Sequence, residues 1–389
     1  ATVNVYSNAK VISEEEQVLR SNTDIEDITM GDTSLTKVEG KDWNYEVELD
    51  SETTTKLNIV PKYSLANVKI EKDNQVISNN SEVSLVGGNN IYKVTITSTD
   101  QTVTKEYKIN IKVKQVEKVS IFGKQYEVID AEPTLTTSSN HTSDASGLYK
   151  STGTNTGKPT YYFRGNVENN YVSFAGFTWR IVRVNEDGTI RIIMQDGINS
   201  NTEYKFNSNY NNYTYMYYTN SQAKTQLESW YQTNIESKAD LTKTVATGAY
   251  YCEQAKAKYS DSWTSGSATM TTYTKYTPDF KCVTDGNGKG LVNASIGLLT
   301  YDEVVYAGGY YGQSNSNYYL NNPVIYWWTM SPAGFLGSYS SVWFVTTTGG
   351  ISYFSVNSTS LAVRPVLNLT ADTQISSGDG SKDSPFVVE

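Results

Sequence analysis

The sequence has little of what catalysis or metal binding requires: its 389 residues include one histidine and two cysteines. The histidine, His141, lies in a Ser/Thr/Gly-rich stretch with no Cys or His nearby, so a Ser-His or Cys-His pair lacks its base and a metal site lacks its ligands. No Gly-rich phosphate loop and no HExxH motif occurs. "DGNGKG" begins like a calcium loop, but Lys289 stands at its fifth position and Ile296 at its twelfth. We therefore expect no enzyme, cofactor or metal, and a carboxylate-pair hydrolase is the enzyme class left open.

Positive charge is also scarce, with 32 Lys and Arg against 41 Asp and Glu, a net charge of -9 and a pI near 4.9. This balance argues against nucleic acid as a partner, because phosphate neutralisation needs Lys and Arg. No run approaches the roughly 18 apolar residues of a membrane helix, so we expect a chain that does not span a membrane. "ATVNVYS" at the start is compatible with cleavage at an A-x-A-like site, and we expect an extracellular protein whose signal or anchor is removed.

The abundant residues favour β-structure. Tyr occurs 31 times against 10 Phe, and Tyr and Thr suit half-buried pleated strands. The two cysteines, Cys252 and Cys282, are either two buried thiols or a disulfide. The segment between them is rich in Tyr, Ser, Thr and Lys and has no obvious core, so a covalent closure would stabilise it most. We expect the disulfide.

The first third of the chain alternates as strands do. "NYEVELD", "YKVTITS" and "EYKINIKV" place apolar residues at every second position, which predicts antiparallel sheets with one buried face. Several such strands within about 100 residues make a β-sandwich. The order of "VGGNNIYKVTITSTDQTVTKEYKINI" resembles the cadherin-like β-sandwich module of bacterial surface proteins, over about 23–115. Such modules act as spacers.

The middle of the chain reads as a connection. Residues 131–160 are rich in Ser, Thr and Gly and nearly without apolar side chains. We expect a sandwich domain over 1–115, a linker with an entry strand over 116–160, and a second domain over 161–389.

The second domain begins with a hairpin, predicted by alternation around Asp187-Gly188 in "FTWRIVRVNEDGTIRIIM". One helix is predicted by the apolar face Ala223, Leu227, Trp230, Tyr231 and Ile235. A second helix begins at the capping box Thr300–Glu303 and stops at Gly308-Gly309. "WWTMSP" places Trp327 and Trp328 on a strand that leads into a turn at Ser331-Pro332-Ala333-Gly334. A second hairpin follows around Gly349-Gly350, and "LAVRPVLNL" reads as a buried strand carrying Arg364.

Five ordered motifs from about Tyr161 onward resemble surface proteins of Gram-positive bacteria whose domain is similar to the C-type-lectin-like fold. They are "YYFRGNVENNYVSFAGFTWRIVRVNEDGTIRIIM", "IGLLTYDEVVYAGG", "WWTMSP", "VRPVLNL" and "GDGSKDSPFVV". The variable domains of diversity-generating retroelement proteins share this fold class. The resemblance implies a β-rich α+β fold: an N-terminal antiparallel β-sandwich, then a lectin-like domain with two helices and a disulfide-stapled insertion. It implies no catalytic residue.

In that fold "WWTMSP" is scaffold, with one Trp packed inward and the other nearer the surface or under a loop. The residues that follow mix rigid aromatics with small polar groups, the mixture of adaptable binding surfaces; hairpin alternation alone would also expose half of them. The candidate ligand-binding residues are Phe335, Tyr339, Ser340, Ser341, Trp343, Tyr353, Ser355, Asn357 and Ser358. Alternation predicts Val342, Phe344 and Ile351 on one face, with Ser341, Trp343 and Val345 on the other, and Trp343 as the exposed anchor.

These features predict a cell-surface binding protein or adhesin, with the sandwich as spacer and the lectin-like domain as head. The alternative is a structural subunit of a surface layer or filament. No Glu-Pro-Asn, Gln-Pro-Asp or Trp-Asn-Asp triplet supports calcium-dependent sugar binding, so we expect an extracellular protein ligand rather than a glycan.

Overall fold

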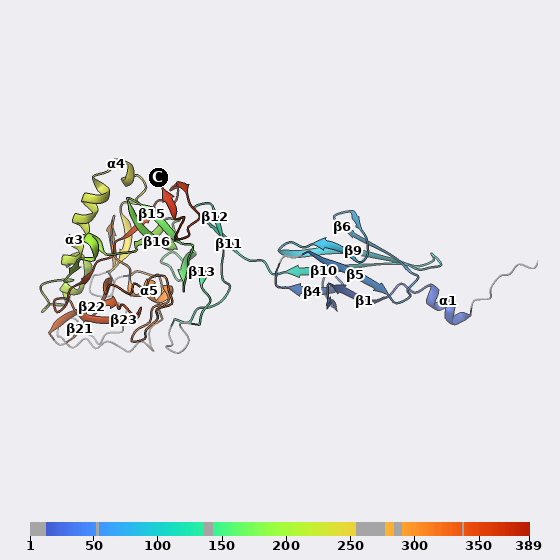
Figure 1. Ribbon diagram of the computed structural model, residues 1–389. Coiled ribbons are helices and arrows are strands. Elements are labelled where there is room, and N and C mark those ends of the chain that lie inside the picture. Colours follow the sequence, from blue (N-terminus) through green and yellow to red (C-terminus); the bar gives the residue numbers. More distant parts are fainter. Residues whose placement is uncertain (1–12, 52–53, 136–142, 254–276, 284–289, 337) are drawn as a thin grey trace, which may run out of the picture. The chain divides into compact units, whose positions relative to one another are not determined.

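The computed structural model describes residues 13–51, 54–135, 143–253, 277–283, 290–336 and 338–389 (Figure 1). The chain divides into two compact units, Ala1–Glu117 and Lys118–Glu389. It is a β-rich α+β protein, as the sequence predicts. His141, Lys289 and most of the segment between the cysteines lie outside the described residues. In the described part of the chain no helix has the length and apolar character needed to cross a membrane.

The first unit is a sandwich of two sheets that follow one short helix, α1 (Glu14–Arg20). One sheet has the order β2 (Thr33–Ser34), β1 (Ile25–Met30), β5 (Thr54–Pro61), β8 (Ser81–Ser84). The other has the order β3 (Thr36–Lys37), β4 (Tyr45–Leu49), β10 (Thr104–Val113), β9 (Gly88–Thr97), β6 (Asn67–Lys72), β7 (Gln75–Ile77).

Period-2 patterning explains the core of this unit. On β9, Tyr92, Val94 and Ile96 are fully buried while Lys93 between them is exposed. One pair departs from the predicted antiparallel arrangement, because β4 lies parallel to β10, with Tyr45 beside Ile109. A tight hairpin forces neighbouring strands to be antiparallel, whereas β4 and β10 are far apart in sequence and the chain can return in either direction.

The second unit is built on two larger sheets. The first has the order β13 (Gly147–Ser151), β14 (Thr160–Arg164), β16 (Phe177–Val184), β15 (Tyr171–Phe174), β27 (Phe386–Val388), β26 (Ile375–Ser377), and β17 (Ile190–Met194) joins β16 to β25 (Val366–Leu369). The second has the order β18 (Glu203–Tyr204), β24 (Leu361–Ala362), β21 (Trp327–Leu336), β22 (Tyr339–Val345), β23 (Ile351–Ser355). Two small ladders complete the strands: β11 (Lys118–Ile121) with β12 (Lys124–Glu127), and β19 (Ala249–Cys252) with β20 (Leu291–Ala294).

Helical elements of this unit follow the predicted pattern. The two expected helices are α3 (Gln222–Tyr231), which continues as the π-helical turn η3 (Gln232–Glu236), and α5 (Tyr301–Ala307). Ser221 caps α3 by accepting a bond from the Lys224 backbone, and the predicted apolar face of the helix is buried. The shorter pieces are α2 (Ile198–Asn201), η1 (Tyr213–Met216), η2 (Tyr218–Asn220) and α4 (Ala239–Thr242).

Much of the range expected to be a linker is instead structured. β11 and β12 form a hairpin whose Ile121 and Tyr126 are buried in the second unit's core, and β13 pairs with β14 along five residues. Asp144 is ion-paired with the buried Arg164 at 2.6 Å. Composition misleads here because a few buried side chains, among them Leu148 and Tyr149, together with backbone pairing hold the segment.

One of the two local predictions in "WWTMSPAGF" is wrong. Ser331 to Gly334 do not form a turn but continue β21, with register shifts around Pro332; a proline is tolerated in a strand at such bulges. Trp327 and Trp328 face opposite sides of the sheet, as predicted, and both are fully buried. Trp328 is covered because its Nε1 donates to the Tyr204 carbonyl at 2.9 Å and its ring packs edge-on against Phe206.

Candidate functional site

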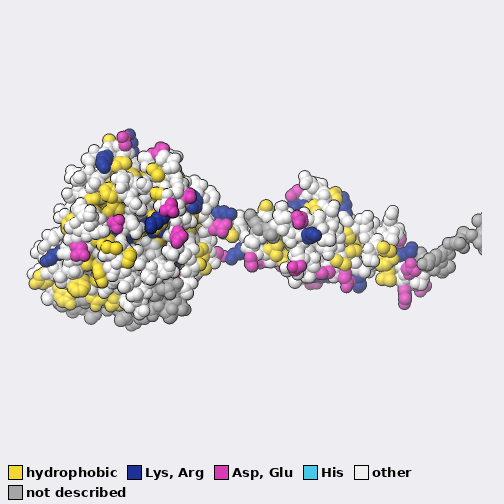
Figure 2. Space-filling view, viewed as in Figure 1, with side chains coloured by type: hydrophobic (Ala, Val, Ile, Leu, Met, Phe, Trp, Pro, Cys, Tyr) yellow, Lys and Arg dark blue, Asp and Glu magenta, His cyan; other side chains and the backbone are white. Residues whose placement is uncertain are grey.

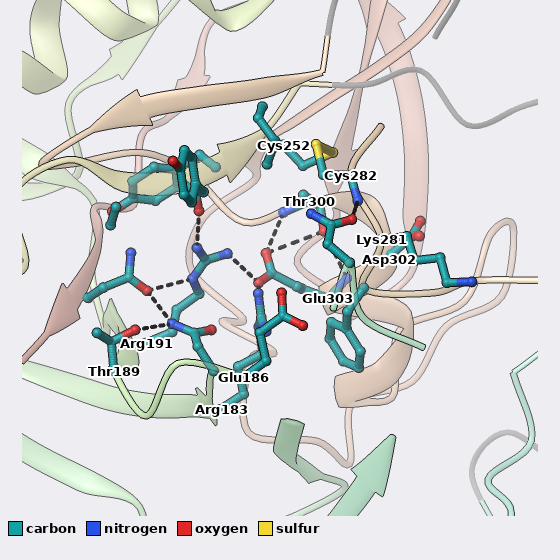
Figure 3. Close-up of a pocket in the computed structure, with 18 of the residues that line it drawn as sticks. Arg183, Glu186, Thr189, Arg191, Cys252, Lys281, Cys282, Thr300, Asp302 and Glu303 are labelled. Carbon is teal, nitrogen blue, oxygen red and sulfur yellow. Dashed lines mark hydrogen bonds and ion pairs between the residues drawn. A yellow bond between two sulfur atoms is a disulfide. The ribbon is translucent and has the colours of Figure 1, made fainter. Parts of the chain in front are cut away.

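A small pocket of about 100 Å³ lies in the second unit where β16, β17, β19 and the start of α5 meet the segment around Cys282 (Figure 3). Its lining is polar and charged, with aromatic groups among the walls. The side chains that matter for its chemistry are Arg183, Glu186, Arg191, Phe280 and Glu303. This volume exceeds the roughly 10–15 Å³ that a single water needs, so the pocket can hold a small ligand.

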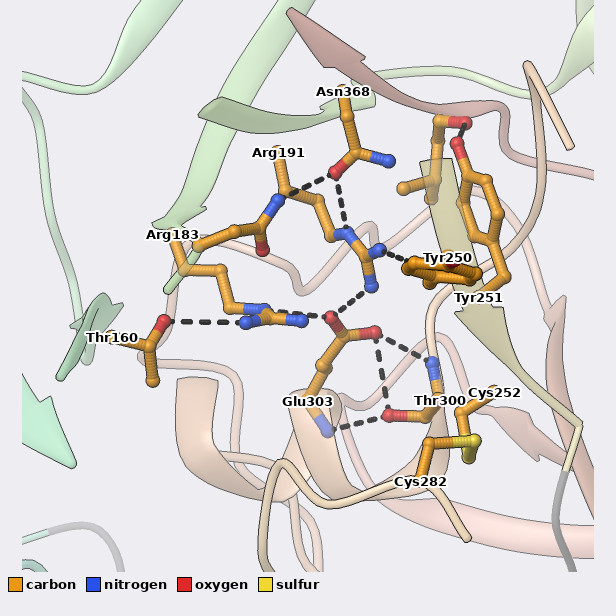
Figure 4. Close-up of polar contacts among 12 residues, drawn as sticks. Thr160, Arg183, Arg191, Tyr250, Tyr251, Cys252, Cys282, Thr300, Glu303 and Asn368 are labelled. Atoms are coloured by element: carbon orange, nitrogen blue, oxygen red, sulfur yellow. Dashed lines mark hydrogen bonds and ion pairs between the residues drawn. A yellow bond between two sulfur atoms is a disulfide. The ribbon is translucent and has the colours of Figure 1, made fainter. Parts of the chain in front are cut away.

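The floor of this pocket is a buried ion network centred on Glu303 (Figure 4). Glu303 Oε1 lies 2.6 Å from Arg191 Nη1 and 3.1 Å from Arg183 Nε. Glu303 Oε2 accepts from the Thr300 backbone at 2.9 Å, while Thr300 Oγ1 accepts from the Glu303 backbone at 3.1 Å. The predicted capping box is therefore present, and its carboxylate also pairs with two arginines.

The two arginines have different surroundings. Arg191 also donates to Asn368 Oδ1 at 3.0 Å and to the Tyr250 carbonyl at 2.7 Å. Arg183 donates to Thr160 Oγ1 at 3.2 Å, and its guanidinium lies 4.8 Å from the centre of the Phe280 ring. Their network is nearly dry, since the side chains of Glu303 and Arg191 are 2% and 4% exposed.

The network shifts the proton affinities of its members. Burial raises the pKa of Glu303, but attraction to Arg191 and Arg183 and the Thr300 hydrogen bond outweigh it and bring this pKa to about 2. Burial, reinforced by the neighbouring Arg191, lowers the pKa of Arg183 to about 10. The floor is therefore ionised at neutral pH and carries one more positive than negative charge.

A disulfide fixes one wall. Cys252 and Cys282 are bonded, as expected, with a Cα–Cα distance of 5.5 Å. Beside Cys282, Phe280 packs against Tyr306, at 4.1 Å between ring centres, and against Tyr162, at 5.4 Å. The Cys282 backbone also donates to Asn155 Oδ1. The disulfide and the Phe280 ring together hold the segment that covers Arg183.

The nine predicted ligand-binding residues do not lie at this pocket, and the structure divides them by burial. Phe335, Ser340, Ser341 and Trp343 are buried; Tyr353, Ser355 and Asn357 are partly buried; Tyr339 and Ser358 are exposed. The expectation that Trp343 is exposed is wrong: it is 4% exposed and packs against Tyr301 and Tyr311, at 4.9 and 5.2 Å between ring centres.

The two faces of the β22–β23 hairpin are nearly as predicted. The register places Val342 and Phe344 on one face, and Ser341, Trp343 and Val345 on the other. Ile351 is misassigned, because it pairs with Val345 and so shares its face. Both faces of β22 are covered, since Val342, Trp343 and Phe344 are 0%, 4% and 7% exposed, and on the Phe344 face it is Phe354 of β23 that reaches the surface.

On this outer face three rings form a row. Tyr326 and Phe354 are 42% and 47% exposed, and Phe344 lies between them at 6.1 and 6.3 Å between ring centres. We call Tyr326, Phe344 and Phe354 the aromatic row. Figure 2 shows hydrophobic side chains gathered on the second unit where Figure 1 labels β21 and β22.

Sequence reasoning misses Arg183, Arg191 and Glu303 as site residues, although a signal is present. "RIVRVNEDGTIRIIM" places arginines within otherwise apolar strands, and a buried arginine requires an anionic or carbonyl partner. The capping-box Glu303 is a carboxylate available for that role. Among the described residues no group of three or more His, Cys, Asp or Glu could hold a metal ion.

Comparison with known proteins adds no relative: no family model, curated protein or solved structure matches this chain. The resemblances to cadherin-like and C-type-lectin-like domains therefore stay predictions from the sequence.

Proposed function

We propose that the chain is an extracellular binding protein or adhesin of a bacterial cell surface. In this proposal the first unit, the sandwich, is a spacer, and the second unit is the head that contacts the ligand. The ligand-contacting surface is the aromatic row and its neighbours on β21, β22 and β23, in place of the Trp343 face predicted from alternation.

The observation that carries the proposal is that Tyr326 and Phe354, two of the exposed aromatic residues of the second unit, flank Phe344 in one row. Trp327, Trp328 and Trp343 of the same sheet are 0%, 0% and 4% exposed. Phe344 fixes the row from beneath, because it packs edge-on against the buried Trp328 at 6.1 Å. Rigid, partly exposed aromatics of this kind supply contact area at low entropic cost and are typical of protein-binding surfaces.

A protein ligand fits this row better than a glycan of the calcium-dependent kind. The described residues form no cluster of metal-ligating side chains, and no acidic sugar-binding triplet occurs in the sequence. Phe354 of the row belongs to β23, the terminal strand of its sheet. That position favours the second candidate, a surface-layer or filament subunit, because terminal strands can pair with another chain.

One experiment separates the two. Labelled protein is applied to arrays of glycans and of immobilised host and bacterial surface proteins, beside the double variant Tyr326→Ser/Phe354→Ser. The control is Leu65→Ser, which removes an apolar side chain that is 66% exposed on the first unit. An adhesin should bind a protein saturably, and the double variant should weaken binding at least about tenfold while the control does not.

Sedimentation velocity over a range of concentrations completes the test. A monomer at all concentrations is expected for the adhesin. Ordered self-association that the double variant abolishes would replace the adhesin by the structural subunit. Binding that Tyr326→Ser/Phe354→Ser leaves unchanged would exclude the aromatic row as the contact surface.

A further inference from the structure

Two groups of opposite charge line the pocket without pairing with each other. Arg183 comes from β16 and Glu186 from the turn that follows it, and both project into the pocket in Figure 3. Glu186 attracts Arg183 electrostatically, yet no ion pair joins them. Each is already held in place by other partners, so the gap between them is built into the site.

Arg183 keeps one end of its guanidinium available. Its Nε donates to Glu303 and its Nη1 donates to Thr160, and the Phe280 ring packs against its plane. Within the described ranges Nη2 donates to no residue. The side chain is 11% exposed, so this nitrogen is a fixed, weakly hydrated donor for an anionic oxygen.

Glu186 is oriented in a comparable way. Its Oε2 accepts from the Thr156 backbone at 3.1 Å and from Thr156 Oγ1 at 2.6 Å. Burial raises the pKa of Glu186, but hydrogen bonds from Thr154 and Thr156 and attraction to Arg183 lower it overall. The carboxylate is therefore ionised at neutral pH. Both Thr156 bonds end on Oε2, and the nearby Thr154 hydroxyl donates to the Lys158 carbonyl at 2.6 Å, so Oε1 is the oxygen that a ligand cation would reach.

We propose that this pocket binds a small zwitterion, namely a free α-amino acid with a short side chain. The carboxylate of the ligand accepts from Arg183 Nη2, and its ammonium group donates to Glu186 Oε1. The pocket volume of about 100 Å³ limits the ligand to the size of glycine or alanine. This proposal concerns a different site from the aromatic row and does not rest on the proposed function.

The charges that line the pocket disfavour a ligand that carries only a carboxylate or only an ammonium group. Five carboxylates line the pocket, Glu186, Asp187, Asp279, Asp302 and Glu303, against Arg183, Arg191 and Lys281. This excess of acid opposes entry of a simple anion. The two arginines of the floor oppose a simple cation at depth, because Glu303 neutralises only one of them. A ligand that carries both charges avoids both penalties.

The test uses the full chain with glycine and L-alanine as probes, and acetate and methylamine as the matched half-ligands. Saturation-transfer NMR and calorimetry measure binding, and the thermal midpoint reports stabilisation by a bound ligand. Glycine or alanine should bind saturably, and acetate and methylamine should bind at least about tenfold more weakly. Glu186→Gln should weaken glycine binding by at least about tenfold, because it removes the charge that receives the ammonium group.

Glu203→Gln is the matched control, since Glu203 is exposed on β18 and does not line the pocket. Glu186 is partly exposed, so its variant is expected to fold, and circular dichroism checks this. No saturable signal for glycine or alanine up to about 50 mM, where specific recognition is no longer meaningful, would overturn the proposal. Equal binding of acetate, or an unchanged affinity in Glu186→Gln, would overturn it too.

Discussion

Arg183 and Arg191 are direct cross-strand partners on β16 and β17, so two buried guanidinium groups stand side by side. Like charges placed opposite each other in a ladder destabilise it. The carboxylate of Glu303 lies between them, 3.1 Å from Arg183 Nε and 2.6 Å from Arg191 Nη1. These two ion pairs therefore connect the first turn of α5 to the sheet.

Neutralising that carboxylate should destabilise the second unit strongly. Glu303→Gln leaves two buried arginines without a counter-charge, and removal of one partner of a buried pair costs about 3–5 kcal/mol. Urea unfolding of wild type and variant measures the loss. Glu203→Gln, an exposed carboxylate on β18, is the control and should change the free energy of unfolding by about 0.5 kcal/mol or less. If Glu303→Gln also lowered the free energy of unfolding by only about 0.5 kcal/mol, the ion network would make no net contribution to stability.

The same carboxylate sets a pH dependence. Its folded pKa is about 2, below the ordinary 4.5. The stabilisation is therefore complete above about pH 4.5 and disappears as the pH falls through about 2. The difference in unfolding free energy between wild type and Glu303→Gln should be constant from pH 7 to 5 and shrink between pH 4 and 2. A difference that stays constant down to pH 2 would contradict the assigned pKa.

The sequence predicts this part of the molecule unevenly. Local signals succeed: the capping box of α5, the apolar face of α3, and the two side-chain sets of the β22–β23 hairpin are where they are expected, with Ile351 as the exception. The alternation of residues does not predict which face of β22 is covered by the rest of the protein, because both faces carry large apolar side chains. That choice depends on Tyr301 and Tyr311, which are distant in sequence and pack on Trp343.

The buried ion network shows a second limit. Thr300 and Glu303 are recognisable as a cap, and the arginines of β16 and β17 are visible in the sequence, but nothing local joins them. Arg191 and Glu303 are separated by 112 residues and meet only through the tertiary fold. The short strand β13 is missed for a related reason, since only Leu148 and Tyr149 of its residues are buried and its partner β14 is set by the tertiary fold.

The disulfide should contribute measurably to stability. Thiol titration of the unreduced, denatured protein should find no free sulfhydryl. Cys252 and Cys282 are 30 residues apart, and closing a loop of that length is worth about 3–4 kcal/mol in chain-entropy terms. The double variant Cys252→Ser/Cys282→Ser should lower the unfolding free energy of the second unit by about that amount. Two free thiols in the wild type would contradict the pairing.

The second unit should require the residues that precede β14. A fragment of residues 118–389 retains the β11–β12 hairpin, β13 and the Asp144–Arg164 ion pair, whereas a fragment of residues 161–389 loses them all. The longer fragment should unfold cooperatively, and the shorter one should be strongly destabilised, because Arg164 would be left buried without its carboxylate. Circular dichroism melts compare them. Equal midpoints would restore residues 118–160 to the role of a linker.

Truncating the two hairpin aromatics should distinguish the inner face from the outer face. Trp343→Ala removes a ring that is 4% exposed and contacts Tyr301, Tyr311 and Tyr353. A large cavity of this kind costs about 3–5 kcal/mol of stability. Phe354→Ala removes a ring that is 47% exposed and should cost about 1 kcal/mol or less. Chemical denaturation of both variants, monitored by a signal from the second unit, gives the comparison.

The effect on ligand binding should have the opposite order. Among correctly folded proteins, Phe354→Ala should weaken binding of the ligand more than Trp343→Ala. The opposite result is that Trp343→Ala unfolds at the wild-type denaturant concentration while Phe354→Ala is severely destabilised. It would show that the Trp343 face is exposed to solvent and would exclude the aromatic row as the contact surface.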